Sequence, residues 1–243
     1  MNKDTTKVIN LLQLYPRDMN IYGDWGNTLV LKKRLEWYGY KVNLLEYNPG
    51  DAFPANVDLI VGGGGQDSGQ GVIGDDLLAI GDKLKALANN NIPMLMVCGL
   101  YQQFGHFFKT RSGDIIEGIG LLDIETVGGD ERLIGNIVAQ NDDFGLIIGY
   151  ENHSGLTTLG PNATPLGKVI RGAGNNGLDE TEGARYKNVI GTYLHGSILP
   201  KNPLLADWLI EKAVTRKYGD FSSTLIDDRF AEQARDIAGR RPR

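Results

Sequence analysis

The only cysteine of the chain, Cys98, follows directly after a short apolar segment, Met94–Val97. Such a segment predicts a buried parallel strand. Gly99 comes next, and Tyr101–Phe108 predicts the start of a helix, so Cys98 stands at a sharp turn between strand and helix. In that geometry the turn exposes the side chain, and the helix directs backbone N–H groups and partial positive charge toward the sulfur. The position favours a nucleophilic thiolate, whereas a free cysteine without this context is more often a buried structural residue.

A histidine far along the chain, His195, is the candidate base for this thiol. The apolar segment Val189–Tyr193 predicts a strand, and His195 lies at its end, before Gly196. A single cysteine with a distant histidine is the arrangement of thiol catalysis, although a lone histidine is more often structural. The other two histidines are weaker candidates, because His106 falls in the helix predicted after Cys98 and His153 falls in a polar turn.

A run of four glycines, Gly62–Gly65, follows the predicted strand Asp58–Val61. It lacks the lysine of a phosphate-binding loop and does not have the spacing of a dinucleotide-binding motif. One interpretation is a flexible loop at a strand end. The other is a close approach of the backbone to a ligand. N–H groups of the Gly63–Gly65 loop, with Gly64 as the first candidate, and of Gly99 or Leu100 after Cys98 would then donate to an oxyanion.

Strands and helices alternate in the first half of the chain, which predicts the α/β class with a parallel sheet covered by helices on both faces. The expected strands are Val8–Leu14, Lys41–Glu46, Asp58–Val61 and Met94–Val97, and the expected helices run from Asp24 or Asn27 to Tyr38, over Asp75–Asn89 and over Pro203–Lys217. Ligands bind beyond the carboxyl ends of such strands, where the glycine run and Cys98 would meet. The stretch from residue 117 to 193 is rich in short strand-like segments and predicts an added antiparallel part.

Composition narrows the class of function. The net charge of −5 argues against a nucleic-acid surface, and one cysteine excludes an internal disulfide and a cysteine-rich zinc site. No segment approaches 18 consecutive apolar residues, and the first ten residues do not resemble a signal peptide, so we expect a cytoplasmic protein without a membrane span. Residues 1–220 are expected to form a single domain, and residues 221–243 a charged C-terminal tail that is either a short helix or disordered.

Four motifs resemble one enzyme family. The sequences Gly62-Gly-Gly-Gly-Gln-Asp67, Cys98-Gly-x-x-Gln102, Gly149-Tyr-Glu-x-His-x-Gly155 and Gly191-Thr-Tyr-Leu-His-Gly196 occur in the order seen in class I glutamine amidotransferases of the cobyric acid synthase type. The resemblance extends over about Val8 to Lys217. It implies a flavodoxin-like fold with a mostly parallel central sheet, and hydrolysis of glutamine by Cys98 and His195. It also makes Gln102, Glu151 and His153 candidate site residues.

Within that family, the chain resembles the free-standing glutaminase (GatD-type) subunits of lipid II isoglutaminyl synthase, because it has no added ATP-binding domain. The segment Arg132–Val138 also resembles this subfamily, which implies that Arg132 binds glutamine. The implied partner is a Mur-ligase-like synthetase in a heterodimer. That partner would hold ATP and Mg²⁺ and amidate D-glutamate of the lipid-linked peptidoglycan stem peptide to D-isoglutamine. No cofactor and no metal are expected in this chain.

Two departures from the family pattern bear on mechanism. Met96 and Leu100 replace glycines that many relatives have two residues before and after the cysteine, so the turn is more crowded. Many class I relatives also carry a glutamate two residues after the histidine, where this chain has Ser197. The acid that orients His195 is therefore expected elsewhere, with Glu151 as a weak candidate and a carboxylate of the synthetase as the preferred one.

Two other classes of function stay open on the residues alone. The first is a non-catalytic scaffold subunit of a synthetase, in which the site has no activity. The second is another thiol hydrolase, such as a peptidase, on the same fold. Retention of both Cys98 and His195 argues against the scaffold, and the four motifs favour the amidotransferase.

Overall fold

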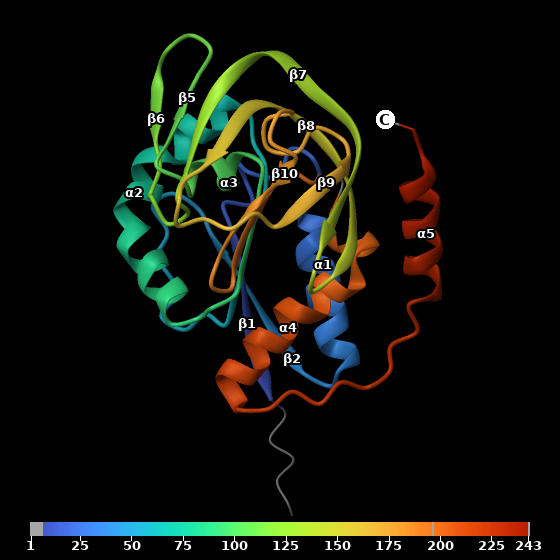
Figure 1. Cartoon of the computed structure of the whole chain (residues 1–243). Helices are drawn as coiled ribbons and strands as arrows, with labels where there is room; N and C mark the ends of the chain where they lie inside the picture. The colour runs from blue at the N-terminus through green and yellow to red at the C-terminus, as the bar shows by residue number, and fades with distance from the viewer. Residues whose placement is uncertain (1–6, 196, 243) are drawn as a thin grey trace, which may run out of the picture.

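The structure, a computed structural model, describes residues 7–195 and 197–242, except for the side chains of residues 67 and 68. Two sheets stand one above the other, and the second lies over the carboxyl ends of the strands of the first (Figure 1). Within the described ranges, no helix has both the length and the hydrophobicity needed to cross a membrane.

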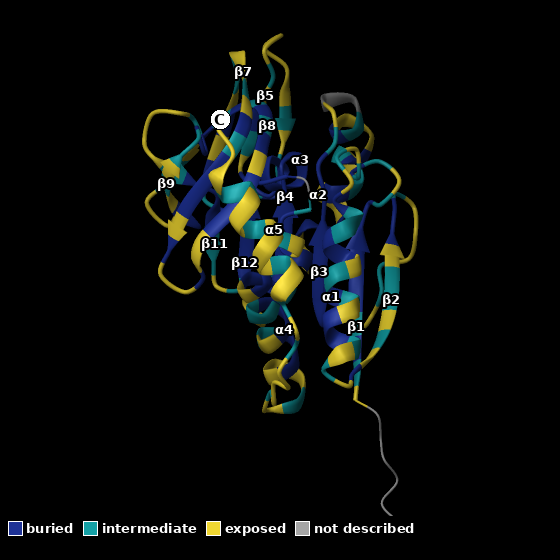
Figure 2. Ribbon diagram, turned by 90° about the vertical axis from the view of Figure 1, so that its right-hand side faces the viewer, coloured by how far each residue is buried: buried dark blue, intermediate teal, exposed yellow. Residues whose placement is uncertain are grey.

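The central sheet has six strands in the order β11-β12-β4-β3-β1-β2. Its strands are β1 (Val8–Leu14), β2 (Lys41–Tyr47), β3 (Leu59–Gly62), β4 (Met94–Val97), β11 (Ala184–Tyr186) and β12 (Val189–Thr192). All neighbouring pairs are parallel except β11 with β12 at one edge. Every residue of β3 and β4 is buried, as expected for strands covered on both faces, and these strands are dark blue in Figure 2.

Helices cover both faces of this sheet. The helices of the described residues are α1 (Trp25–Trp37), α2 (Asp67–Asn89), α3 (Gly99–Gln103), the 3₁₀ helix η1 (Leu199–Lys201), α4 (Pro203–Tyr218) and α5 (Arg229–Arg240). Of these, α5 lies beside η1 and the strands β7 and β8 instead of on the central sheet. Helices α1 and α4 pack together on one face, and α2 lies on the other (Figure 1). Right-handed crossovers explain this division, because the chain moves from β1 to β2 in one direction and from β3 to β4 in the other.

The second sheet is antiparallel except for the pair β5 and β7, and its order is β10-β9-β7-β5-β6, with β8 paired to β7. Its strands are β5 (Phe107–Lys109), β6 (Ile115–Glu117), β7 (Ile124–Asn141), β8 (Gly145–Leu159), β9 (Gly167–Arg171) and β10 (Thr181–Glu182). The long β7–β8 hairpin is its main element, and its register shifts between Gly128 and Leu133. Arg132 lies within this irregular segment.

The α/β class, the mostly parallel sheet and the added antiparallel part are confirmed. Two boundaries differ from the prediction. Helix α2 begins at Asp67 instead of Asp75, so the glycine run leads straight into it. The helix after Cys98 ends at Gln103, because the N–H of His106 donates to the carbonyl of Ile124 and starts the pairing that places Phe107–Lys109 in β5.

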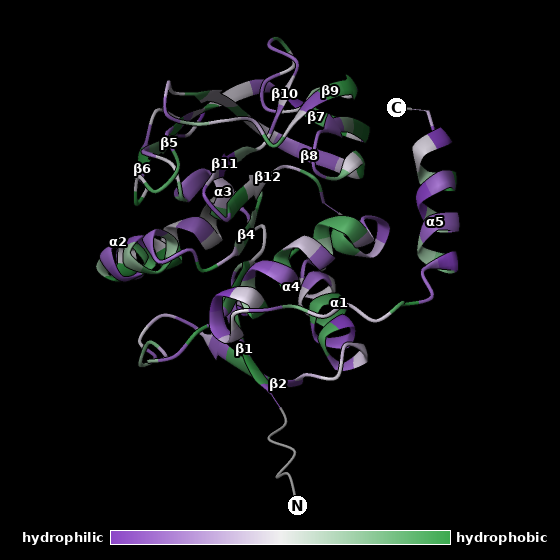
Figure 3. Ribbon diagram, turned by 60° about the horizontal axis from the view of Figure 1, so that its bottom comes forward, coloured by the Kyte–Doolittle hydropathy of each residue, from purple (hydrophilic) through white to green (hydrophobic). Residues whose placement is uncertain are grey.

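The C-terminal segment forms α5, the helical alternative for the tail. None of its residues is buried, and Figure 3 shows that its surface is mainly hydrophilic. Polar contacts hold it instead of a packed core. Arg171 Nη2 donates to the carbonyl of Gly239 at 2.7 Å, and Asn136 Nδ2 donates to that of Pro242 at 2.6 Å.

Arg34 of α1 joins this tail to the domain, because its guanidinium pairs with Asp207 of α4 and with Asp228 before α5, each at 2.6 Å. The Arg34 side chain is 4% exposed and the two carboxylates are 27% and 26% exposed.

Arg34→Ala leaves both carboxylates unpaired, so we expect the free energy of unfolding to fall by about 2–3 kcal/mol. This is less than the loss expected when one partner of a wholly buried ion pair is removed. Urea denaturation measures this. The matched control is Arg229→Ala, which removes the exposed pair with Asp227 and should leave the midpoint unchanged. Equal midpoints for both variants would contradict this role for Arg34.

Candidate active site

Cys98 stands at the turn between β4 and α3 with φ of +51° and ψ of −104°. A positive φ is uncommon for a residue other than glycine and marks a strained turn. The Cys98 N–H donates to the carbonyl of Thr192 on β12 at 2.8 Å, so the neighbouring strand holds this turn. The strand–turn–helix geometry predicted for Cys98 is confirmed, although α3 is only five residues long.

The Cys98 side chain lines a cavity of about 360 Å³ between the two sheets. The residues around it come from six parts of the chain and are Tyr22, Gly65, Gln66, Gln70, Cys98, Gln102, Phe108, Arg132, Asn152, His153, Ser154 and Gly155. A cavity of this size is at the lower end of the range for small-molecule sites, which suits a ligand as small as an amino acid. No cluster of three His, Cys, Asp or Glu side chains able to hold a metal ion occurs among the described residues.

His195 and Cys98 both pack against Gly64. A Cβ atom built on Gly64 would lie 3.0 Å from Cβ of Cys98 and 3.0 Å from Cε1 of His195, so only glycine fits between them. The backbone N–H of His195 donates to the carbonyl of Tyr150 at 2.7 Å, which fixes the end of β12 against the β7–β8 hairpin. Burial, and then the charges of His153 and Arg132, lower the pKa of His195 to about 3. The imidazole is therefore neutral and able to accept a proton.

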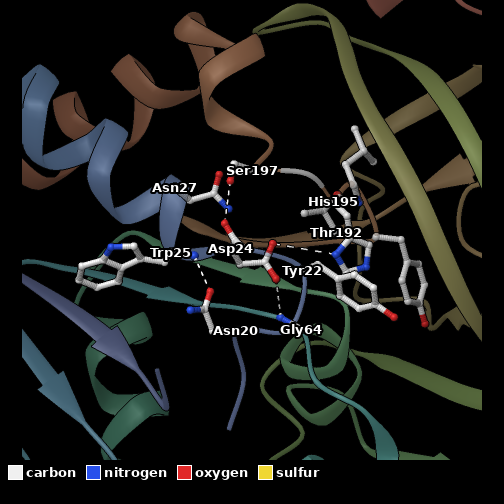
Figure 4. A network of polar contacts seen from close by, with 12 residues as sticks. Asn20, Tyr22, Asp24, Trp25, Asn27, Gly64, Thr192, His195 and Ser197 are labelled. Atoms are coloured by element: carbon white, nitrogen blue, oxygen red, sulfur yellow. Dashed lines mark hydrogen bonds and ion pairs between the residues drawn. The ribbon is translucent and has the colours of Figure 1, made fainter. Parts of the chain in front are cut away.

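A carboxylate of this chain, that of Asp24, faces His195. Asp24 Oδ1 lies 3.9 Å from His195 Nδ1, and Asp24 Oδ2 accepts the N–H of Gly64 at 2.8 Å (Figure 4). Sequence analysis expected this acid from Glu151 or, preferably, from the synthetase. The Glu151 expectation does not fit, and a carboxylate of the synthetase stays a prediction. The Glu151 carboxylate accepts the N–H groups of Ala173 and Gly174 at 2.8–3.1 Å. Sequence analysis gave Asp24 only as a possible start of the helix that ends at Tyr38, and this concealed its position at the site.

The bond to Asp24 also corrects the expected oxyanion donor. The N–H of Gly64 is already engaged by Asp24, so it is not available to a ligand. The next residue, Gly65, lines the cavity, and its nitrogen lies 3.2 Å from where a Cβ of Gly99 would be. Gly99 opens α3, and the first N–H groups of a helix have no acceptor within it. Gly65 and Gly99 are thus the adjacent pair of backbone donors beside Cys98.

Arg132 reaches the same cavity from β7. Its Nε donates to Asn152 Oδ1 at 2.6 Å and its Nη2 donates to the hydroxyl of Tyr22 at 2.9 Å. The Tyr22 ring also lies against His195, with 4.4 Å between ring centroids. Sequence analysis gave no indication of Tyr22, because nothing in the loop before α1 marks it as a site residue.

Gln102 and His153 are both in the site and are held by neighbouring groups. Gln70 Nε2 donates to Gln102 Oε1 at 2.8 Å, and Gln102 Nε2 donates to the hydroxyl of Tyr193 at 3.0 Å. The His153 ring stacks on Tyr193 with 3.6 Å between centroids. His153 Nδ1 lies 2.8 Å from the carbonyl of Gly155, which can only accept, so Nδ1 carries the proton. These contacts form a polar floor under Cys98.

Comparison with known proteins agrees with this geometry. The model of the CobB/CobQ-like glutamine amidotransferase domain matches residues 10–203, most of the chain. The chain belongs to this family. Within the CobB/CobQ-like family it is 40% identical over 220 residues to the "Lipid II isoglutaminyl synthase (glutamine-hydrolyzing) subunit GatD" of Staphylococcus aureus, with 90% of each chain covered. It is 38% identical to the protein of the same name from Streptococcus pneumoniae, with 94% of this chain and 91% of that one covered.

Other relatives in the CobB/CobQ-like family are longer. The match to a probable cobyric acid synthase of Methanosphaera stadtmanae is 34% identical and covers 47% of this chain but 25% of that protein. Two solved glutamine amidotransferases share the fold at low identity. The first has a TM-score of 0.55 and 14% sequence identity, and the match covers 83% of this chain and 98% of that one. The second, from Thermotoga maritima, has a TM-score of 0.53 and 15% sequence identity, and the match covers 95% of this chain and 93% of that one.

Proposed function

We propose that this chain is the glutaminase subunit of a lipid II isoglutaminyl synthase, a two-subunit enzyme that amidates a peptidoglycan precursor. The observation that carries the proposal is a cavity lined by a thiol at a strained turn and by an arginine, with a neutral, buried histidine packed against Gly64 beside the thiol. The relatives named as the glutamine-hydrolysing subunit of that synthase match over nine-tenths of this chain and support the assignment.

The proposed reaction is hydrolysis of the side-chain amide of glutamine. Cys98 Sγ attacks the amide carbon while its proton passes to His195, and the N–H groups of Gly65 and Gly99 bind the oxyanion. His195 then gives the proton to the leaving nitrogen, so that the C–N bond breaks and ammonia departs. Water cleaves the γ-glutamyl thioester, which releases glutamate and returns the proton to the thiol.

We propose that Arg132 binds the α-carboxylate of glutamine, because a guanidinium at the cavity wall fits a carboxylate with two hydrogen bonds. Arg132→Ala should raise KM for glutamine about 10–100-fold with a smaller change in kcat, since a charge-assisted hydrogen bond is worth about 1.5–3 kcal/mol. Arg132→Lys should recover only part of this affinity, because lysine lacks the planar fork. Steady-state kinetics measures both variants. Glutamine kinetics of Arg132→Ala equal to wild type would remove Arg132 from substrate binding.

The partner in this proposal is a Mur-ligase-like synthetase that forms a heterodimer with this chain. Forming an amide from a carboxylate requires activation, so ATP and Mg²⁺ belong to the partner, as does the lipid-linked acceptor with its D-glutamate. Because the reaction consumes ATP, we place the complex in the cytoplasm. Ammonia passes from this chain to the partner within the complex.

Glutamate release from glutamine, by the chain alone and with its synthetase, tests the proposed function. Asparagine, one methylene shorter, is the control substrate and should react far more slowly, because its amide carbon does not reach Cys98 while its carboxylate is held at Arg132. A scaffold subunit would release no glutamate in either state. A peptidase on this fold would cleave peptides and not free glutamine, and either result would overturn the proposal.

A further inference from the structure

Arg132 lies where the pairing of β7 with β8 is interrupted. The regular pairs stop at Gly128 and resume at Leu133, which lies opposite His153. The Arg132 side chain is also exposed. An arginine on such a surface ordinarily samples many rotamers, and a ligand that binds it has to restrict that freedom. In this structure two side chains of the cavity restrict it beforehand.

Asn152 of β8 makes the first of these contacts. It lies directly opposite Ile134 in the hairpin, and Arg132 stands two residues before Ile134, so the two side chains are diagonal neighbours on one face of the sheet. Arg132 Nε donates to Asn152 Oδ1 at 2.6 Å. A guanidinium can only donate, so the amide atom of Asn152 that faces it is the oxygen. A regularly paired strand therefore anchors the arginine.

Tyr22 makes the second contact, because Arg132 Nη2 donates to its hydroxyl at 2.9 Å. The Tyr22 ring is itself fixed by its surroundings. It lies against the ring of His195 with 4.4 Å between centroids (Figure 4), and a Cβ built on Gly64 would lie 3.4 Å from Cδ2 of Tyr22. The N–H of Ile21 donates to the carbonyl of Gly64 at 3.2 Å and holds the same loop. Tyr22 therefore ties the guanidinium to the glycine run.

These two contacts leave most of the guanidinium free for a ligand. They use two of its five N–H donors. The other three, which include both hydrogens of Nη1, have no acceptor among the described contacts. Arg132, Asn152 and Tyr22 all line the cavity that Cys98 lines. A carboxylate that enters this cavity therefore meets a guanidinium whose position is already set.

We propose that Asn152 and Tyr22 are positioning residues that hold Arg132 in the orientation that binds the α-carboxylate of glutamine. This inference rests on the proposed function and adds to it the two side chains that determine where the substrate is anchored. Both act through Arg132. Because the guanidinium is held before glutamine arrives, binding restricts less rotamer freedom. The two contacts therefore improve the affinity for glutamine and do not assist the breaking of its C–N bond.

Asn152→Ala and Tyr22→Phe each remove one acceptor from Arg132. Tyr22→Phe keeps the ring against His195, so it removes the hydroxyl alone. In the full chain with its synthetase, we expect each variant to raise KM for glutamine about 3–10-fold, since immobilising one long side chain has a cost of that order. We expect kcat to stay within about twofold of wild type, because a contact that strengthens ground-state and transition-state binding equally affects KM alone. Steady-state kinetics measures both constants.

A double-mutant cycle separates positioning of Arg132 from a direct contact with glutamine. In an Arg132→Ala background there is no guanidinium left to position. Asn152→Ala should then raise KM for glutamine no further, although it raises KM in the wild-type background. A residue with a merely structural role, or one that touches glutamine itself, would add its own effect in both backgrounds.

Asn136→Ala is the matched control. Asn136 lies two residues beyond Ile134 in the same hairpin, and like Asn152 it is half-buried. Its amide also makes a hydrogen bond, to the carbonyl of Pro242 at 2.6 Å, but it does not line the cavity. This variant should leave KM and kcat unchanged.

A wild-type KM in Asn152→Ala or in Tyr22→Phe would overturn the inference. So would a loss confined to kcat, or a rise in KM that Asn152→Ala also causes in the Arg132→Ala background. In each of these cases glutamine hydrolysis by the wild-type chain leaves the proposed function standing. Failure of wild type to hydrolyse glutamine, alone and with its synthetase, would overturn the proposed function itself.

Discussion

Replacing Cys98 with serine or alanine is expected to abolish glutamine hydrolysis, with kcat lower by about 10⁴-fold or more, as when a covalent nucleophile is removed from other enzymes. Alanine has no nucleophile. Serine has one, but its hydroxyl is far less acidic than a thiol, and the low pKa of His195 makes that imidazole a weak base for it. Glutamate release by the chain, alone and with its synthetase, measures the loss.

The fold should survive both changes. Serine and alanine are close to cysteine in volume, and the backbone bond from residue 98 to the carbonyl of Thr192 does not involve the side chain. An unchanged circular dichroism spectrum and melting temperature are the controls. If either variant retained glutaminase turnover near that of wild type, covalent catalysis by Cys98 would be wrong.

The second large effect concerns the division of labour between subunits. This chain alone should amidate nothing, even with ATP and acceptor present, whereas the complex should amidate with glutamine as nitrogen donor. Ammonium salts should replace glutamine and make this chain unnecessary for the synthetase. The Cys98→Ser complex is the matched control, because it should lose amidation with glutamine and keep amidation with ammonium.

Amidation is followed by the mass of the acceptor peptide, which falls by about one dalton when a carboxylate becomes an amide. ATP-dependent amidation by this chain in the absence of the synthetase would contradict the division of labour. So would a synthetase that uses glutamine at the same rate with the Cys98→Ser chain as with wild type.

The groups that sequence analysis placed well are those with a local signal. Cys98 follows an apolar strand and precedes a glycine, and His195 ends another strand, so the carboxyl ends of neighbouring strands β4 and β12 bring them to the same edge. The motifs supplied Arg132, Gln102 and His153, and the structure places all three at the cavity. Local patterns suffice where a strand end or a motif fixes the position.

Tyr22 and Asp24 were missed for a physical reason. They lie in the loop after β1, which meets the glycine run only because β1 and β3 pair side by side, with Leu14 opposite Gly62. The N–H of Ile21 then donates to the carbonyl of Gly64, and this contact closes the loop over His195. An aspartate directly before a helix also looks like an ordinary cap. Only the tertiary arrangement shows that its carboxylate is directed elsewhere.

The length of the short helix α3 was also not predictable from the local sequence. Residues 101–108 have the composition of a helix, but β5 is required to pair with β6 and β7, so the helix ends after one turn. Pairing with strands distant in sequence overrode the local preference, which is the usual way in which a boundary prediction fails.

The most direct test of the central claim is the mass of the intact chain after reaction with a diazoketone analogue of glutamine. Such an electrophile requires a nucleophile within reach of the bound side chain. The account predicts a single adduct, located on Cys98 by peptide mapping, slowed by free glutamine and absent from Cys98→Ser. Loss of glutaminase activity with the label on another residue, or hydrolysis of glutamine by a chain that never takes up the label, would contradict it.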